Sequence, residues 1–158
     1  MDRDELLGLF RAFEKAGLEY VLIGATAMGL QGVVRATEDV DLIVRATPEN
    51  LDRLRASLRE AYQGDPNIDE IRDEDLLGEY PAVRYFPENG QLFLDVMTRL
   101  GTAADFDTVE SETKVFEGIR VTLATPRALY RLKRDTLRPR DRQDAEMLAH
   151  EFGLKETD

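Results

Sequence analysis

Residues 20–44 read YVLIGATAMGLQGVVRATEDVDLIV, and this stretch decides the fold of the chain. It opens with an apolar run, YVLI, that has the length and the residue types of a buried strand. Gly24 and the small residues after it suit a sharp turn into a short apolar helix near residues 26–30. The stretch ends in DVDLIV at residues 39–44, which predicts a second strand.

Two aspartates interrupt this second strand, although aspartate is uncommon in strands and in protein interiors. Side chains at positions i and i+2 of a strand point to the same face, so Asp39 and Asp41 project side by side. A third carboxylate, Asp95, lies inside another strand-like segment, QLFLDVMT at residues 91–98. If the two strands are neighbours, the three carboxylates meet and raise one another's pKa values unless a cation neutralises them.

Such a cluster predicts a metal site. Oxygen-only ligands suit a hard ion, Mg²⁺ or Mn²⁺, rather than Zn²⁺. Two such ions roughly 3.5–4 Å apart can activate an attacking oxygen and stabilise a phosphoryl leaving group. The turn at Gly24 offers backbone N–H groups and a helix N-terminus, both of which favour phosphate oxygens, and small side chains there let phosphates approach.

These acids also have simpler interpretations. Asp39 and Asp41 can end a strand and pair only with arginines. Asp95 can be a partly exposed acid that pairs with Arg84 or Arg99. The continuation of the strand beyond the acids, as LIV, favours the metal site over these alternatives.

The rest of the chain predicts one α+β domain with a mixed sheet, because helical and strand-like segments alternate and then separate. We expect N-terminal helices on one face and a C-terminal helix pair against one end of the sheet. The domain is expected to span residues 1–158, with a core at about 18–124 and the C-terminal helices at about 125–153. The other expected helices are at residues 3–16, 47–62, 125–135 and 140–152, and the other expected strands at residues 68–72, 80–86, 108–116 and 119–123.

Composition limits the class of protein. The chain has 158 residues, a net charge of −11 and no cysteine, so disulfides and thiolate metal sites are excluded. No run approaches the ~20 apolar residues of a membrane helix, and the acidic N-terminus does not resemble a signal peptide. We therefore expect a cytoplasmic protein without a membrane partner.

Charge is unevenly distributed along this acidic chain. A net charge of −11 argues against non-specific binding of nucleic acid, which depends on neutralising phosphates. Residues 127–142, RALYRLKRDTLRPRDR, are nevertheless strongly basic. Arginines on a terminal helix often form only a solvated face, so this segment alone assigns no function.

Two motifs resemble those of a known family. A strand that ends in a glycine turn, then a helix, then R-x-T-x-D-x-D on a strand is the hallmark of the nucleotidyltransferase (polymerase-β-like) superfamily. More narrowly, residues 23–44 resemble minimal bacterial nucleotidyltransferases grouped with AbiEii-type and MenT-type toxins. Residues 132–144, from Leu132-Lys133 to Asp144, resemble the downstream K…R-x-[KR]-D-x-x-D motif of that group. The resemblance spans about residues 18–150.

The resemblance implies a role for each candidate residue. Asp39, Asp41 and Asp95 would bind Mg²⁺ or Mn²⁺, with Asp95 also a candidate general base. The phosphate-binding set would be Gly24, Ala25, Thr26, Arg35, Thr37 and Lys133. Asp144 would orient Lys133 or contact the nucleotide. The implied reaction is in-line attack by an acceptor oxygen on the α-phosphate of an NTP, with release of pyrophosphate.

The acceptor and the biological role stay open at this stage. An RNA or tRNA 3′ end is the favoured acceptor, and such an enzyme is a candidate toxin held by an antitoxin partner. A protein hydroxyl or a small molecule such as an aminoglycoside is the alternative acceptor. A third hypothesis is a non-catalytic protein that binds nucleotide or a partner, because the family's Gly-Gly or Gly-Ser turn is here Gly24-Ala25.

Overall fold

The computed structural model describes residues 2–33, 36–102, 104–134 and 138–158. Arg35, one of the expected phosphate-binding residues, lies outside these residues. The helical elements are α1 (Arg3–Ala16), α2 (Gly24–Leu30), α3 (Pro48–Ala61), the 3-10 helix η1 (Pro66–Glu70), α4 (Asp73–Leu77), α5 (Pro126–Arg134) and α6 (Pro139–Phe152). The strands are β1 (Tyr20–Ile23), β2 (Asp39–Val44), β3 (Ala82–Tyr85), β4 (Phe93–Met97), β5 (Arg99–Leu100), β6 (Ala104–Asp105), β7 (Ser111–Phe116) and β8 (Ile119–Ala124).

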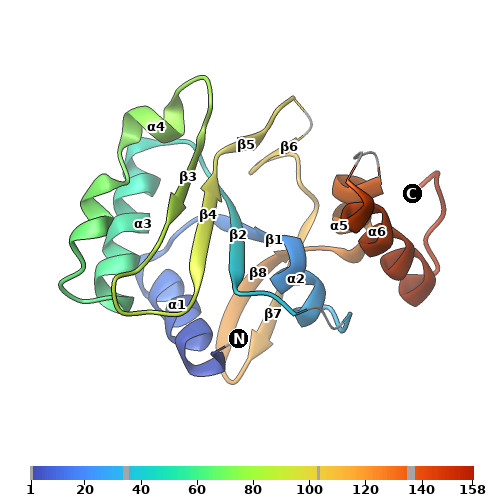
Figure 1. The fold of residues 1–158 in the computed structure, drawn as a ribbon, viewed down its shortest axis with the longest axis horizontal. Coiled ribbons are helices and arrows are strands. Elements are labelled where there is room, and N and C mark those ends of the chain that lie inside the picture. Colours follow the sequence, from blue (N-terminus) through green and yellow to red (C-terminus); the bar gives the residue numbers. More distant parts are fainter. Residues whose placement is uncertain (1, 34–35, 103, 135–137) are drawn as a thin grey trace.

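The main sheet is mixed, which confirms the predicted α+β class. Its strand order is β3-β4-β2-β1-β8-β7, and a two-stranded sheet, β5-β6, lies beside it (Figure 1). Strand β2 pairs parallel with β4, and β1 pairs parallel with β8, whereas the other pairs of the main sheet are antiparallel. The strands that carry the predicted acids are therefore direct neighbours.

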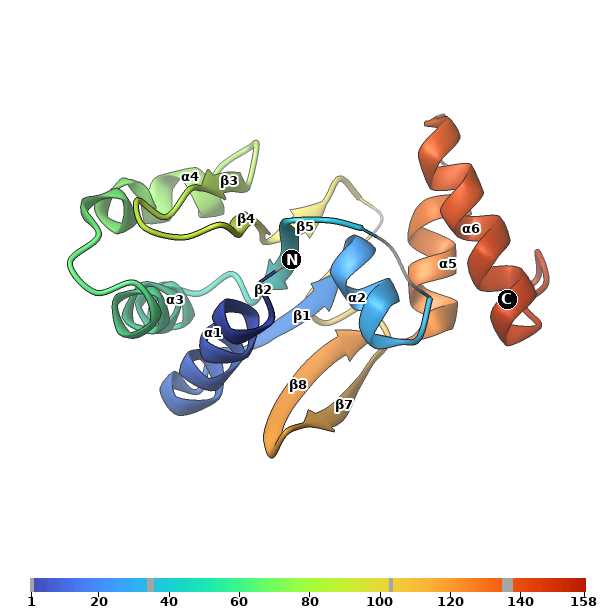
Figure 2. The ribbon, with the colours of Figure 1, turned by 60° about the horizontal axis from the view of Figure 1, so that its bottom comes forward.

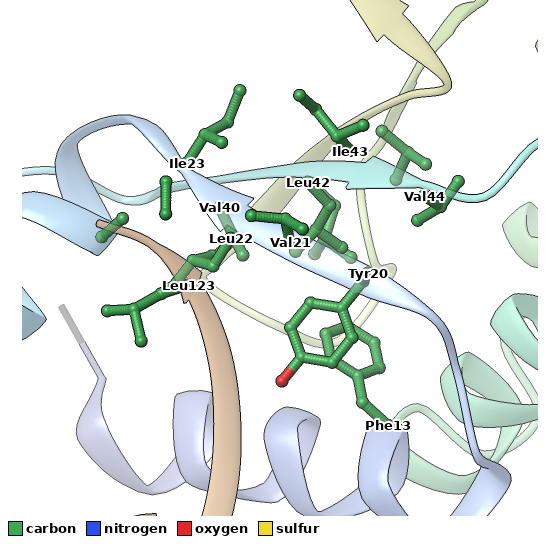
Figure 3. Close-up of a cluster of buried hydrophobic side chains, with 14 of the residues drawn as sticks. Phe13, Tyr20, Val21, Leu22, Ile23, Val40, Leu42, Ile43, Val44 and Leu123 are labelled. Carbon is green, nitrogen blue, oxygen red and sulfur yellow. The ribbon is translucent and has the colours of Figure 1, made fainter. Parts of the chain in front are cut away.

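Alternating burial along β2 and β4 separates an apolar face from a polar face. Val40, Leu42, Leu94 and Val96 are fully buried, whereas the aspartates between them are only partly buried. Figure 3 shows the packing around β1 and β2, where Phe13 of α1 lies against Tyr20 with ring centroids 4.9 Å apart. Helices α1 and α3 lie side by side along one side of the sheet in Figure 2. The core therefore fixes the backbone that presents the acids on the other face.

Several helix boundaries follow the predicted local signals. The Asp2 side chain accepts a hydrogen bond from the backbone N–H of Glu5 at the start of α1, and Gly17 ends that helix with a positive φ of 70°. Thr47 caps α3 in the same way, and Pro48 occupies its first turn. These contacts explain why the boundaries could be read from sequence.

The strand predicted at residues 68–72 is wrong, because residues 68–70 belong to the 3-10 helix η1 and residues 71–72 connect it to α4. Asp65 accepts a hydrogen bond from the Asn67 N–H, and Pro66 stands in the first turn, so the local chemistry starts a helical turn. Ile68 is buried as part of this helical turn and not as part of a strand. Smaller differences are that α2 begins at Gly24 and that β7 begins only at Ser111.

The C-terminal pair, α5 and α6, lies at one end of the molecule beside α2 in both ribbon views (Figures 1 and 2). The two helices pack closely on each other, with Leu129 and Leu148 fully buried. Among the described residues, none of the helices has the length and apolar character needed to cross a membrane.

Asn50 provides a test of how the sheet is anchored. Its buried side-chain amide accepts a hydrogen bond from the Glu19 N–H at 2.9 Å and donates to the carbonyls of Glu19 and Arg45 at 2.9 and 3.1 Å. Asn50→Ala leaves three backbone groups without these bonds, so we expect the free energy of unfolding to fall by about 2–4 kcal/mol in chemical denaturation.

The matched control is Glu49→Ala, at an exposed position of the same helix turn. It should change the free energy of unfolding by less than ~1 kcal/mol. Equal losses for the two variants would contradict the anchoring role of Asn50.

Candidate active site

The parallel register of β2 and β4 brings the predicted acids together. Asp41 pairs directly with Asp95, and Asp39 pairs with Phe93 two positions earlier. Opposite residues of neighbouring strands share a face, and so do residues i and i+2. Asp39, Asp41 and Asp95 therefore form one acid cluster on the polar face of the sheet. The clustering predicted from sequence is what the structure contains.

The charges of this acid cluster disturb its own ionisation. The pKa of Asp41 is raised to about 7, mainly because burial disfavours the charged form and further because of the charge of Asp95 and a hydrogen bond with it. The pKa of Asp39 is also raised, first by burial and then by the charge of Asp95. Both shifts favour the protonated carboxyl groups. Nearby positive charge would oppose the shifts by stabilising the ionised form.

Arg84 supplies part of that positive charge from the edge strand β3. It stands opposite Asp95 in the antiparallel β3–β4 register. Its Nε donates to Asp95 Oδ1 at 2.7 Å, and a terminal nitrogen donates to Oδ2 at 3.2 Å. Asp95 thus belongs to the acid cluster and also forms the ion pair with Arg84 that the sequence suggested as an alternative. Arg99 instead donates to the carbonyl of Glu79.

Gly24 is required by the closeness of Asp41. Its φ is +73°, in the left-handed region that favours glycine, and a Cβ built at this position would lie 2.1 Å from Asp41 Oδ2. Strand β1 ends one residue earlier, opposite Asp41 in the β1–β2 pairing. The glycine turn therefore lies directly against the acid cluster, as the sequence pattern predicts.

The other turn residues lie elsewhere. The buried Thr26 hydroxyl donates to the Asp39 carbonyl at 2.7 Å, and the Thr37 hydroxyl accepts from the Asp39 N–H at 3.0 Å. Both hydroxyls hold the start of β2 in place. Ala25, Thr26 and Thr37 line a cavity of about 370 Å³ that is separate from the one lined by Gly24 and Asp41.

Lys133 on α5 faces the acid cluster from the C-terminal helices. Its charge lowers the pKa of Asp41 against the upward shifts. Its Nζ donates to Asp144 Oδ2 at 2.7 Å and lies 3.6 Å from Asp141 Oδ1. Asp144 is 2% exposed, so it forms a fixed anchor on α6 that orients the lysine. The lysine and the final aspartate of the second motif are thus in direct contact.

A cavity of about 580 Å³ connects these parts. One wall is the sheet with Gly24, Asp41 and Asp95, and the opposite wall is the C-terminal helices with Lys133. The cavity also has apolar lining from both sides, provided by Val83, Met97, Leu100, Leu129 and Leu132. Charged groups at one end and apolar side chains beside them suit a ligand with both anionic and planar apolar parts.

The residue types fit a hard divalent cation, because carboxylates offer only oxygen ligands. A bound cation would also offset the repulsion from Asp95 that contributes, after burial, to the raised pKa values of Asp39 and Asp41. Among the described residues, however, no group of three His, Cys, Asp or Glu side chains has the arrangement of a metal-binding set. Instead, the Arg84 guanidinium forms an ion pair with the Asp95 carboxylate. Ligation by all three acids would therefore use the lone pairs of Asp95 that Arg84 leaves open.

Sequence reasoning did not assign a site role to several residues that the structure brings here. Arg138 lines the cavity, and Arg140 is close enough to lower the pKa of Asp39. Both belong to the second motif, which could have indicated them. The apolar lining residues carry no motif, and only the docking of α5 beside β4 identifies them.

Comparison with known proteins supports the fold. No protein-family model and no curated protein matches the chain. Among solved structures, an antigenic nucleotidyltransferase-like protein from Paracoccidioides brasiliensis is similar over 95% of this chain and 78% of that chain, with a TM-score of 0.59 and 20% identity. ANT(2″)-Ia in complex with adenylyl-2″-tobramycin is similar over 96% of this chain and 91% of that chain, with a TM-score of 0.55 and 15% identity.

A third similar structure is JHP933 from Helicobacter pylori, with 94% of this chain and 65% of that chain covered, a TM-score of 0.51 and 21% identity. At such identities the likeness establishes the fold alone. The chain thus has the α+β fold of nucleotidyltransferase-like proteins, as the resemblance of its motifs implies.

The contact between Gly24 and Asp41 generates a stability prediction. Gly24→Ala places a Cβ against the Asp41 carboxylate and forces alanine into the left-handed region, at a cost of at least about 1–2 kcal/mol. Thermal unfolding should show a clear loss of stability. Gly29→Ala is the control within the same helix, because a Cβ there meets nothing within 4 Å, and it should be neutral or stabilising. An unchanged melting temperature for Gly24→Ala would contradict the described turn.

The raised pKa of Asp41 generates a pH prediction. Its pKa is higher in the folded than in the unfolded protein, so its contribution to stability is full below the unfolded value near 4 and is lost as pH rises through about 7. Carboxylates bind Mg²⁺ in their ionised form. We therefore expect Mg²⁺ to raise the melting temperature more at about pH 8 than at about pH 5.5.

Asp41→Asn should remove this pH-dependent Mg²⁺ effect and stabilise the metal-free protein at about pH 8 by about 1–3 kcal/mol, because it removes a buried charge. Asp69→Asn, at an exposed position of η1, is the control and should retain the wild-type response to Mg²⁺. A Mg²⁺ shift of equal size in Asp41→Asn would show that the ion binds elsewhere.

Proposed function

We propose that this protein is a metal-dependent nucleotidyltransferase that transfers NMP from an NTP to an acceptor hydroxyl. The proposal is supported chiefly by the direct pairing of Asp41 with Asp95, beside Gly24 and facing Lys133 across one cavity. Carboxylates in such numbers are costly in an apolar site without cations, whereas phosphoryl transfer needs them to hold metal ions. The fold shared with nucleotidyltransferase-like proteins agrees with this chemistry.

Asp39, Asp41 and Asp95 would hold Mg²⁺ or Mn²⁺. When bound, the ions polarise the phosphate oxygens and neutralise charge that develops during transfer. The NTP lies in the 580 Å³ cavity, with its base against apolar side chains such as Leu129 and Leu132. Its β- and γ-phosphates lie between the Gly24 turn and Lys133, which Asp144 holds in place.

The chain's own groups perform the proton and charge transfers. Asp95 accepts the proton of the acceptor hydroxyl, whose oxygen forms a bond to the α-phosphorus. The bond from that phosphorus to the bridging oxygen breaks, and pyrophosphate leaves toward Lys133, which stabilises its charge. In this scheme Arg84 holds the Asp95 carboxylate in position through two hydrogen bonds before the substrates bind.

The acceptor that we favour is the 3′ hydroxyl of an RNA such as a tRNA, and the biological role that we favour is a toxin held by an antitoxin. The basic residues Arg138 and Arg140 beside the acid cluster support an anionic acceptor. The similar structure with adenylyl-2″-tobramycin supports a small-molecule acceptor as the second candidate.

Transfer of label tests the reaction. Radiolabelled NTPs, Mg²⁺ and either tRNA, a protein extract or tobramycin should yield a labelled acceptor, and mass spectrometry should identify the added NMP. Asp41→Asn should lower the rate at least about a hundredfold, because it removes a charged group that stabilises the transition state. Asp69→Asn on the surface should retain the wild-type rate.

Two outcomes would contradict the proposal. If the Asp41→Asn variant transfers as much label as the wild type, the acid cluster has no catalytic role. Nucleotide binding that is independent of Mg²⁺ and produces no pyrophosphate with any acceptor would support a non-catalytic binding protein instead.

A further inference from the structure

An aromatic shelf lies beside the acid cluster, and the reaction scheme uses its arginine but not its two rings. The shelf consists of Phe86, Phe93 and the Arg84 guanidinium. The two rings are stacked, with centroids 5.3 Å apart and an interplanar angle of 29°. The Arg84 guanidinium lies 5.6 Å from the centre of the Phe93 ring, within the range of a cation–π contact.

The shelf is unusual because its outer ring is largely in solvent. Phe86 is 54% exposed, although it directly follows the edge strand β3, where a polar residue would cost nothing. Isolated exposed apolar residues need no explanation, but this one stacks on a second ring and adjoins a charged site. Stacked aromatic and guanidinium planes open to solvent are the surfaces on which nucleobases stack.

Strand register places the two rings of the shelf at the end of the acid cluster that lies outside the nucleotide cavity, whereas Arg84 lines that cavity. Arg84 stands opposite Asp95, and Phe93 stands opposite Asp39. Along the same strands but in the other direction, Ala82 stands opposite Met97, and both of these line the cavity. The two rings thus lie beside Asp39, the acid that does not line the 580 Å³ cavity, and Arg84 borders both the cavity and the rings.

In-line transfer decides which substrate meets the shelf. The attacking and leaving oxygens lie on opposite sides of the α-phosphorus. In the proposed function the pyrophosphate leaves toward Lys133 in the cavity. The acceptor hydroxyl must then arrive from the opposite side, where Asp95 borders Arg84 and the rings. The chemical group attached to that hydroxyl therefore lies over the shelf.

We propose that the aromatic shelf binds the nucleobase of the acceptor nucleotide, so that Phe86 stacks on the base at the 3′ end of a single-stranded RNA. This inference rests on the proposed function for the direction of attack. A polycationic acceptor such as an aminoglycoside would be repelled by the Arg84 guanidinium, which already pairs with Asp95 at this place. A planar base gains from both the rings and the cation.

Binding through stacking also agrees with the overall charge of the chain. At a net charge of −11, phosphate neutralisation over a wide surface is weak. Stacking needs no net positive charge, and Arg140, which is close enough to Asp39 to lower its pKa, adds local positive charge for the terminal phosphates. The shelf thus reconciles an acidic protein with an RNA acceptor.

Fluorescence anisotropy with a short fluorescein-labelled single-stranded RNA tests the proposal. Phe86→Ala should weaken binding by roughly tenfold, the loss expected for one base–aromatic stack. Phe86→Trp should retain wild-type affinity because it keeps a stacking plane. Val115→Ala removes an exposed apolar side chain from the distant edge strand β7 and should bind like the wild type. Circular dichroism confirms that the variants fold.

A second RNA, identical except for an abasic nucleotide at its 3′ end, identifies the contact. It should bind the wild type about as weakly as the intact RNA binds Phe86→Ala, and Phe86→Ala should weaken it no further. Wild-type protein that shows no saturable binding, or equal losses from Phe86→Ala on both RNAs, would overturn the proposal. A loss of MgATP affinity in Phe86→Ala without a loss of RNA affinity would assign the shelf to the NTP and would also overturn it.

Failure of the shelf is distinguishable from failure of the proposed function. If Phe86-dependent RNA binding is present but no label is transferred, the shelf stands and the transferase activity falls. If label is transferred and RNA affinity is independent of Phe86, the activity stands and the shelf assignment falls.

Discussion

The parallel pairing of β2 with β4 is the constraint on which the rest of this molecule depends. It sets Asp41 opposite Asp95 and so brings together carboxylates that repel one another. The apolar residues that alternate with them are completely buried, and burial of these residues stabilises the register. A slip of one residue would bury the acids and expose Val40 and Leu42. The core thus holds the acid cluster in place although the acids themselves disfavour it.

The repulsion among these carboxylates explains the residues that surround them. Gly24 has no side chain, which leaves room for the Asp41 carboxylate, and Arg84 pairs with Asp95 from the edge strand. Lys133 faces the acids from a different part of the chain and is held by a buried carboxylate on α6. Strain of this kind is expected at functional sites, where stability is given up for chemistry. In our account a divalent cation and a triphosphate complete the balance of charge.

Local patterns were sufficient for part of this description. The i, i+2 spacing placed Asp39 and Asp41 on one face, and Thr47-Pro48 marked the start of α3. The adjacency of Asp95 depends on a parallel pairing across about fifty residues, which the hydrophobic pattern does not encode. The family resemblance implied only that Asp95 joins the other two acids. Residues 68–72 were misassigned because their apolar residues suited a strand, whereas Asp65 and Pro66 start a 3-10 turn. Local capping chemistry outweighed the apolar pattern there.

Other parts of the site follow only from three-dimensional packing. Stacking of Phe86 on Phe93 requires the β3–β4 register, and the apolar cavity wall requires α5 to dock beside β4. The most direct test of the account is isothermal titration calorimetry of a non-hydrolysable NTP analogue, with Mg²⁺ and with a chelator. The account predicts saturable binding that depends on Mg²⁺ and is lost in Asp41→Asn. Equal affinity in the presence of chelator would contradict the assignment of the acid cluster as a metal and triphosphate site.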